Sequence, residues 1–323
     1  MTKNSYHLDW SDLAFGSKQG LKDLQAIFIV APREMSARRF KQLIKDYLPK
    51  GNLVFGMAQE DYVLGLELQP QFATLRLESV KPIIDKVNTS ASANKVYTLT
   101  YSQRDITYIL EKANFKRVIL VNGSWYRAFH RRPEYYTLVK NHITYEMVSP
   151  FFDEQEAKQY PETVTLPSIP KEGYFSQSEI IELVDQSAKH SYDYGASQTG
   201  AVLGLKENNK YKLLATAHNE IIPYETYAMH FGSSREKNFS PLHDLNHYDT
   251  NHAEVGIIVA AQKHKLDLSG STLFINLLPC PTCARMLVTT DIAEFVYSED
   301  HSSGYAANML ESAGKKVRRL IRK

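Results

Sequence analysis

The chain has 323 residues, of which 43% are apolar, and its 38 Lys and Arg residues against 36 Asp and Glu residues give a net charge of +2. This length accommodates two domains with ordinary cores, and the balanced charge argues against non-specific nucleic-acid binding by the chain as a whole. There is no run of about 18 apolar residues, and Met1–Asp12 lacks the layout of a signal peptide, so we expect a soluble, cytoplasmic protein without a membrane partner. Its two cysteines, Cys280 and Cys283, leave no disulfide framework if a metal binds them.

Residues 1–160 alternate between short apolar runs and amphipathic segments. The predicted strands are residues 26–30, 53–55, 96–101 and 118–121, and the predicted helices are residues 34–47 and 103–113. This alternation predicts a separate α/β domain with a parallel sheet covered by helices. Because the segment contains no G-x-x-x-x-G-K-[ST] loop, we assign no nucleotide kinase activity to it.

A basic and aromatic loop follows the strand predicted at residues 118–121. Its candidate binding residues are Trp125, Arg127, His130 and Arg132. Loops at the carboxyl ends of parallel strands commonly bind ligands, and these side chains suit a nucleotide or a nucleic acid. The alternative interpretation is that the rings pack against the domain interface while the arginines are solvated. The sequence alone leaves both interpretations open.

Prolines and a lack of periodicity mark residues 161–175 as a linker, so residues 176–323 form a second domain. The capping-box pattern from Ser176 to Glu179 predicts the start of a helix. The predicted strands that follow are residues 199–205, 211–217, 272–277, 294–297 and 317–321. A helix predicted at residues 305–313 joins the last two strands, and a right-handed crossover of this kind makes them parallel.

The residues of the second domain that can carry chemistry are His252, Glu254, Cys280 and Cys283. One imidazole and two thiols at i, i+3 are three ligands that suit zinc, and they leave a fourth position for water. Zinc would lower the pKa of that water towards about 7, and Glu254 would move its proton as general acid and base. We therefore predict one catalytic Zn²⁺ per chain. A redox cysteine pair and a non-catalytic zinc site are the alternatives.

These residues lie where helices are predicted to begin. The first helix runs from Glu254 to Leu266, with Val255, Ile258 and Val259 on its apolar face. A second helix starts at the cysteine pair, and both helix N-termini carry partial positive charge that favours thiolate and carboxylate.

From about Ser176 to its end, the chain resembles the cytidine and deoxycytidylate deaminase superfamily. The resemblance rests on the H-x-E and P-C-x-x-C motifs and on the segments Ser191–Asp193, Gly200–Leu203 and Ala217–Asn219. It implies a three-layer α/β/α fold with a five-stranded mixed sheet, in the branch whose last strand is parallel. The N-terminal half resembles the extra domain of some large bacterial deoxycytidylate-deaminase-like proteins, which transfers no activity to it.

The resemblance also implies which residues meet the nucleotide substrate. Asn219 would hydrogen-bond the sugar, and Ala253 lies between the metal ligand and the acid–base residue. The strand-end residues Tyr297, Ser298 and Glu299 are similar to the segment that borders the base pocket. Because members of the superfamily commonly assemble, a homo-oligomer is expected.

The segment between residues 220 and 250 is longer than in a minimal deaminase. Its histidines, His230, His243 and His247, are interpreted either as a second metal site or as polar side chains of a loop. Arg235 in the same segment would either bind a 5′-phosphate or be solvated. The basic tail, residues 315–323, is predicted to be an edge strand, with contact to nucleic acid as the alternative.

Together these features predict hydrolytic deamination of a cytosine nucleotide, with deoxycytidylate converted to deoxyuridylate. One alternative is a base deaminase that acts on a polynucleotide, either tRNA or single-stranded DNA. The other alternative belongs to a different class, a nucleotide-sensing module in which zinc is non-catalytic. The sequence leaves open the sugar, the number of phosphates, any effectors and the number of subunits.

Overall fold

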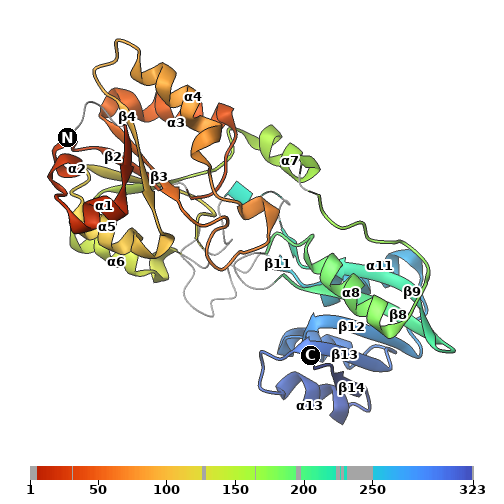
Figure 1. Ribbon diagram of the computed structural model, residues 1–323. Coiled ribbons are helices and arrows are strands. Elements are labelled where there is room, and N and C mark those ends of the chain that lie inside the picture. The colour runs from red at the N-terminus through yellow and green to blue at the C-terminus, as the bar shows by residue number, and fades with distance from the viewer. Residues whose placement is uncertain are drawn as a thin grey trace. The chain divides into compact units, whose positions relative to one another are not determined.

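The computed structural model describes residues 6–30, 32–125, 129–163, 165–193, 198–222, 226, 229–230 and 250–321 (Figure 1). The chain divides into two compact units, Met1–Thr165 with Thr226–His247, and Leu166–Glu225 with Tyr248–Lys323. The segment Thr226–His247 therefore groups with the first unit, although the sequence assigned it to the second domain. None of the helices among the described residues has the length and apolar character needed to cross a membrane.

The first unit is built on a six-stranded sheet with the order β1-β4-β3-β2-β5-β6, in which every neighbouring pair is parallel. Its strands are β1 (His7–Asp9), β2 (Ile27–Val30), β3 (Leu53–Ala58), β4 (Val96–Tyr101), β5 (Arg117–Val121) and β6 (Tyr145–Val148). The predicted parallel sheet is confirmed. After β2 the chain builds one side of the sheet through β3 and β4, and it then builds the other side through β5 and β6.

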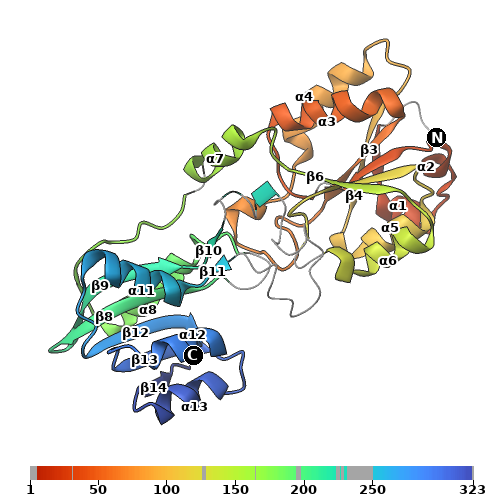
Figure 2. The same ribbon diagram turned by 180° about the vertical axis from the view of Figure 1, so that it is seen from behind.

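Helices cover both faces of this sheet (Figures 1 and 2). They are α1 (Trp10–Phe15), α2 (Gln19–Asp23), α3 (Ala37–Tyr47), α4 (Leu77–Asn88), α5 (Ile106–Lys112) and α6 (Pro133–Lys140). The helix α7 (Glu154–Thr163) follows β6. Side chains of β2 alternate between the two cores. Phe28 and Val30 pack in the core that includes α5 and α6, whereas Ile27 and Ile29 pack in the core that includes α3 and α4. This double burial explains why the strand is apolar at every position.

The second unit has a mixed sheet with the order β14-β13-β12-β8-β9-β7. Its strands are β7 (Tyr174–Phe175), β8 (Gly200–Glu207), β9 (Lys210–His218), β12 (Ser271–Leu277), β13 (Glu294–Glu299) and β14 (Lys316–Arg319). The last two strands, β13 and β14, are parallel, as the sequence predicted. The strand β12 is also parallel to β13, and β8 is antiparallel to both β9 and β12. The mixed sheet has one strand more than the predicted five, because β7 adds two residues beside β9.

The helices α8 (Gln177–Ala188), α11 (Ala253–His264), α12 (Pro281–Leu287) and α13 (Tyr305–Ser312) complete the second unit. The core that contains Val202 is shared with α8, and the core that contains Ala201 is shared with α11, α12 and α13, so the unit has three layers. Ser176 and Glu179 form the predicted capping box at the start of α8. Gly200 has no side chain because a Cβ there would lie 2.2 Å from the carbonyl oxygen of Val184 in α8.

Ordered elements occupy both ends of the predicted linker, residues 161–175. The helix α7 extends to Thr163, and β7 begins at Tyr174. At the other end of the unit, the predicted basic edge strand is β14, where Lys316 and Arg318 form ion pairs with Glu294. These pairs neutralise part of the tail's positive charge.

Candidate metal and acid–base site

The structure brings His252, Cys280 and Cys283 together at the starts of two helices. His252 is the N-cap of α11, and Cys280 is the N-cap of α12 and accepts a hydrogen bond from the Cys283 backbone N–H at 3.4 Å. The His252 Nδ1 atom lies 3.6 Å from Cys280 Sγ and 3.4 Å from Cys283 Sγ. Their ligand atoms all lie within 4.8 Å of one another. Residues far apart in the sequence therefore form one compact donor set.

Local backbone features place the two sulfurs. The loop after β12 is held to the end of β13, because the Leu278 N–H donates to the Glu299 carbonyl at 2.7 Å. Pro281 then occupies the first position of α12, where its fixed φ favours the helix and its missing N–H costs nothing. The i, i+3 spacing of the cysteines then directs both sulfurs to one side of this helix.

Each of the two cysteines shifts the pKa of the other. The pKa of Cys280 is lowered to about 3, chiefly because the Cys283 thiol donates a hydrogen bond to its sulfur. The pKa of Cys283 is raised for the converse reason, and the pKa of His252 is raised by its hydrogen bond with Cys280. One nitrogen and two sulfurs of this character fit Zn²⁺, which binds thiolate and neutral imidazole.

Glu254 lies beside this donor set in the first turn of α11. Its side chain is only 3% exposed, and burial raises the pKa of its carboxyl group, although the charge of His252 partly opposes the shift. The carboxyl group of Glu254 also contributes to the raised pKa of Cys283. A buried carboxyl group with a raised pKa, next to a metal-binding set, is suited to accepting and returning a proton near neutral pH.

Asn219 is tied directly to the start of α11. Its side-chain oxygen Oδ1 accepts a hydrogen bond from the Ala253 N–H at 2.9 Å, and both residues are buried. Asn219 immediately precedes β10 (Glu220–Ile221), and His252 immediately follows β11 (Thr250–Asn251), which pairs antiparallel with β10. The structure thus brings Asn219 and Ala253 to the metal-binding set. Their contact with substrate stays a prediction.

Asp193 belongs to the same site and was not singled out from the sequence. It is 4% exposed, its backbone N–H donates to the Ser191 hydroxyl, and its charge contributes to the raised pKa of His252. Its place in the family-like segment Ser191–Asp193 was the signal that could have identified it. A carboxylate near a metal-binding histidine commonly fixes the orientation of the imidazole.

The three candidates at the end of β13 do not share one side of the sheet. Tyr297 is buried in the core shared with α11, α12 and α13, and Glu299 is exposed. Ser298 instead lines a small hollow with Ile181 and Val184 of α8. Successive residues of a strand point to opposite faces, so Ser298 lies on the face away from the metal-binding set.

The face of α11 that packs against the sheet also differs from the predicted one. Ala253, Ile257 and Ala261 are buried, whereas Val259, placed by the sequence on the apolar face, is 52% exposed. The predicted face was wrong because nearly every position in this helix is apolar or small, so periodicity could not identify the buried side.

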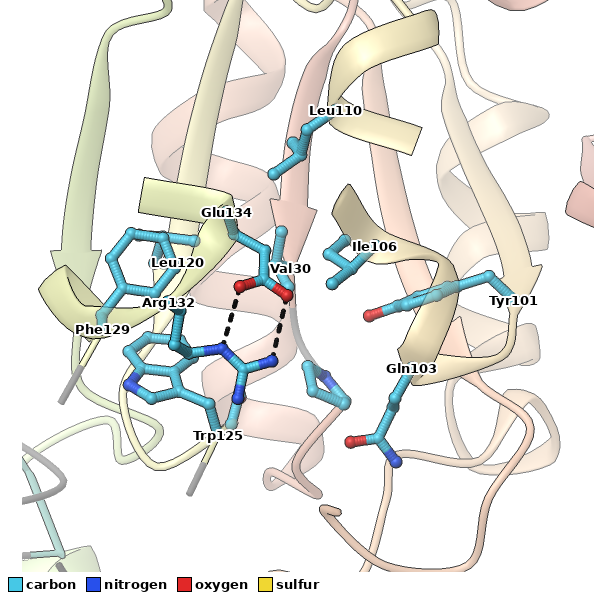
Figure 3. A pocket seen from close by; sticks show the side chains of 12 residues that line it. Val30, Tyr101, Gln103, Ile106, Leu110, Leu120, Trp125, Phe129, Arg132 and Glu134 are labelled. Carbon is cyan, nitrogen blue, oxygen red and sulfur yellow. Dashed lines mark hydrogen bonds and ion pairs between the residues drawn. The ribbon is translucent and has the colours of Figure 1, made fainter. Parts of the chain in front are cut away.

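In the first unit, Trp125 and Arg132 are engaged within the domain (Figure 3). Trp125 is 8% exposed and packs on Phe129 with ring centroids 5.0 Å apart. Arg132 makes a two-bonded ion pair with buried Glu134, with both distances 3.0 Å. The hollow between these residues has a volume of about 30 Å³, which is room for one or two waters. These contacts favour the packing interpretation for both residues.

The remaining candidates of the first unit are His130 and Arg127. His130 lies in a 3₁₀ turn, Phe129–Arg131, directly before α6. Arg127 lies outside the described residues, and binding by either residue stays a prediction.

Of the residues proposed for a second metal or for phosphate, only His230 is described. Its ring nitrogens contact Glu154 at 2.8 Å and Ser149 at 2.7 Å. Both nitrogens are thus occupied by protein groups. Arg235, His243 and His247 lie outside the described residues, so the second metal site and the phosphate contact stay untested.

Comparisons with known proteins agree with this site. The family model "Cytidine and deoxycytidylate deaminase zinc-binding region" matches residues 176–299. Deoxycytidylate deaminase of Enterobacteria phage T4 is 31% identical over 68 residues, which are 20% of this chain and 35% of the phage protein. A probable deoxycytidylate deaminase of Drosophila melanogaster is 27% identical over 148 residues, 42% of this chain and 67% of the fly protein. The chain thus spans about a third of the length of the phage relative.

Among solved structures, dCMP deaminase from the cyanophage S-TIM5 in complex with dCMP and dUMP covers 45% of this chain and 96% of its own, with 19% identity and a TM-score of 0.36. The family model covers both halves of the metal-binding motif together with Asn219 and the end of β13. Residues 176–299 of this chain therefore match the zinc-binding region of the cytidine and deoxycytidylate deaminase family.

Proposed function

We propose that this protein is a zinc-dependent deaminase that hydrolyses the exocyclic amine of a cytosine nucleotide, converting deoxycytidylate and water into deoxyuridylate and ammonia. The observation that carries the proposal is the buried Glu254 beside the set of His252, Cys280 and Cys283. A purely structural zinc site would have no use for a buried carboxyl group at that place, because burial of an ionisable group costs stability.

In this reaction the three ligands would hold Zn²⁺, which supplies the Lewis acidity that makes water nucleophilic near neutral pH. Glu254 accepts the proton that the attacking water loses and delivers it to ring nitrogen N3. The remaining hydroxyl adds to ring carbon C4. Glu254 then moves the proton of that hydroxyl to the amine, so that the C4–N bond breaks, ammonia leaves and a carbonyl remains at C4. The raised pKa of Glu254 supports both directions of transfer, since a carboxyl group that ionises nearer neutral pH gives its proton back more readily.

The choice of a nucleotide with deoxyribose follows the relatives, which are named as deoxycytidylate deaminases. Asn219 would hydrogen-bond the sugar from its position beside Ala253. The bond from the Ala253 N–H fixes the side-chain oxygen of Asn219 and so orients the whole amide group.

The test is Glu254→Gln, assayed by mass-spectrometric detection of deaminated product and by ammonia release. The panel contains cytidine, deoxycytidine, their mono- and triphosphates, tRNA and single-stranded DNA. We expect wild type to deaminate deoxycytidylate most efficiently and the variant to lose about 10²- to 10⁴-fold in kcat, the usual contribution of general acid–base catalysis. The variant should retain one zinc per chain.

A matched control is Glu311→Gln, which changes an exposed glutamate in α13. The control should keep wild-type turnover and zinc content. Retention of full turnover by Glu254→Gln would refute the proposed acid–base role. A wild-type protein that binds zinc and nucleotides but releases no ammonia would support the nucleotide-sensing alternative.

A further inference from the structure

A serine, a histidine and a glutamate meet at the carboxyl end of β6 in the first unit. Ser149 directly follows β6, and Glu154 is the first residue of α7 (Figure 2). His230 belongs to the segment Thr226–His247, which groups with the first unit. The His230 Nδ1 atom lies 2.7 Å from the Ser149 hydroxyl oxygen, and its Nε2 atom lies 2.8 Å from the Glu154 carboxylate. The imidazole is thus held between a hydroxyl and a carboxylate.

The chemistry of the three side chains fixes the direction of both hydrogen bonds. A carboxylate only accepts hydrogen bonds, so the Nε2 atom of a neutral imidazole must carry the hydrogen that Glu154 receives. The Nδ1 atom is then an acceptor, and the Ser149 hydroxyl must donate to it. The Phe151 N–H also donates to the Ser149 oxygen, at 3.1 Å, which helps to fix the hydroxyl group. The serine hydroxyl therefore directs its proton at a base.

Neighbouring groups hold Glu154 in its ionised form. Burial raises the pKa of its carboxyl group, but hydrogen bonds from Thr226 and His230 outweigh burial and lower the pKa below its ordinary value. The Thr226 hydroxyl donates to Oε1 at 2.5 Å, and His230 binds Oε2. Glu154 also lies in the first turn of α7, where the helix favours negative charge. A fixed carboxylate orients the imidazole and stabilises the positive charge that the ring acquires when it takes a proton.

Arg39 places positive charge beside the serine. Its Nε atom donates to the Ser149 carbonyl oxygen at 2.9 Å. A fixed guanidinium near a nucleophile stabilises the negative charge that develops on a carbonyl group under attack. Ser149, His230 and Glu154 are all partly exposed, and 42% of the Glu154 side chain is accessible to solvent. The set is therefore open to a small reagent.

We propose that Ser149, His230 and Glu154 form a second, hydrolytic site, which cleaves small carboxylic esters through a serine nucleophile. The arrangement is a nucleophile within hydrogen-bond reach of a base that a third group orients, and serine hydrolases on unrelated folds share it whatever the order of the residues in the chain. Ser149 is the nucleophile and His230 the base, whereas Glu154 is a positioning residue that acts through His230. This activity does not depend on the proposed deaminase function.

The reaction has two halves, joined by an acyl group on the serine. In the first half, the Ser149 oxygen attacks the ester carbonyl carbon while His230 Nδ1 takes the hydroxyl proton. The bond to the alcohol oxygen then breaks, and His230 gives the proton to the departing alcohol. In the second half, His230 takes a proton from water, and the resulting hydroxide attacks the acyl carbon. The bond to Ser149 breaks, and the serine oxygen recovers the proton. The net reaction converts ester and water into carboxylic acid and alcohol.

The test uses the full chain and two probes, an alkyl fluorophosphonate and p-nitrophenyl acetate. The fluorophosphonate should phosphonylate Ser149 with loss of fluoride, and peptide mass spectrometry should find the label at that residue. Ser149→Ala should take up no label. With p-nitrophenyl acetate, His230→Gln should lose about 10²-fold in kcat, the contribution of a general base. Glu154→Gln should also lose about 10²-fold in kcat or more, with little change in KM, because Glu154 acts on the imidazole and does not touch the ester.

The matched controls are Ser79→Ala and Glu78→Gln, which change exposed residues of α4 in the same unit and should keep wild-type labelling and hydrolysis. Fluorescence of Trp10 and Trp125 shows whether a variant keeps the first unit folded. If His230→Gln does not fold, labelling of the wild type and its loss in Ser149→Ala still decide, because that variant removes only one oxygen atom. An unlabelled Ser149 in the wild type would overturn the proposal, and so would a Ser149→Ala variant that hydrolyses the ester at the wild-type rate.

Discussion

The hydrogen bond between Asn219 and Ala253 gives a prediction whose size follows from the structure. Replacing Asn219 with Ala removes the acceptor of the hydrogen bond from the Ala253 N–H, a group at the start of α11 on a residue with 0% exposure. An unsatisfied buried donor costs about 1–3 kcal/mol, so the second unit should lose about 2 kcal/mol of unfolding free energy. Asn219→Asp keeps an acceptor oxygen at this place and should lose less.

The two variants also separate folding from sugar recognition. Both lose the amide donor that the family resemblance assigns to the sugar, so both should show a raised KM for deoxycytidylate. Both tryptophans, Trp10 and Trp125, lie in the first unit, and their fluorescence would not report unfolding of the second. Native-state hydrogen exchange of the α11 amides measures the unfolding free energy of the second unit directly.

Asn308→Ala is the control, because Asn308 is exposed in α13 and its removal should change the unfolding free energy of the second unit by less than about 0.5 kcal/mol. If the α11 amides of Asn219→Ala exchange at the same rate as those of the control, the hydrogen bond to Ala253 contributes nothing to the stability of the second unit, which contradicts the prediction. It also fails if Asn219→Asp loses as much stability as Asn219→Ala.

Three further predictions concern backbone strain, pH and metal. Gly123→Ala should lower the unfolding free energy of the first unit by about 2 kcal/mol or more, because the φ of Gly123 is +77° and the new Cβ would collide with Arg33. Urea titrations followed by tryptophan fluorescence measure this loss. Gly270 has a similar φ of +71° but open space around it, so Gly270→Ala should lower the unfolding free energy of the second unit by only about 1 kcal/mol. Burial, and next the charge of His190, lower the pKa of His218 to about 4, so the folded state binds fewer protons than the unfolded state and stability falls as pH drops from about 6.5 to 4. Between pH 7 and pH 5, the unfolding free energy measured by hydrogen exchange should therefore fall by about 1–2 kcal/mol less in His218→Gln than in the wild type. An equal fall in both proteins would contradict the lowered pKa of His218. Chelation of zinc should speed exchange of the α11 and α12 amides and leave the first unit unchanged; uniform exchange would argue against a metal in the second unit.

The metal-binding residues were predictable because their residue types and spacing are visible in two short stretches of sequence. His252 and Cys280 each begin a helix, and spacing alone placed Cys283 one turn later on the same side. The parallel sheet of the first unit was predictable for a similar reason, since apolar runs such as residues 27–30 read as strands buried on both faces.

Features decided by tertiary packing could not be read from the sequence. The buried face of α11 was mistaken because Val259 and Ile257 are equally apolar, and only the sheet beneath decides which is covered. Arg132 was predicted to bind phosphate because the sequence does not show that its charge is paired. In the structure, Glu134, two residues later, forms the ion pair with it. The docking of His230 depends on Ser149 and Glu154, which lie more than 70 residues earlier in the chain.

The first unit is discontinuous in sequence, because Thr226–His247 joins it after the chain has already begun the second. During synthesis, therefore, the ribosome must translate roughly three quarters of the message before the earlier unit can be completed. A fragment that ends at residue 165 would lack Met229, which is buried in the first unit. A fragment that begins at residue 166 would contain Met229 but would expose its apolar side chain to water. Two-piece complementation should consequently require the fragments to meet, and the pair would be expected to purify together rather than as separate folded halves.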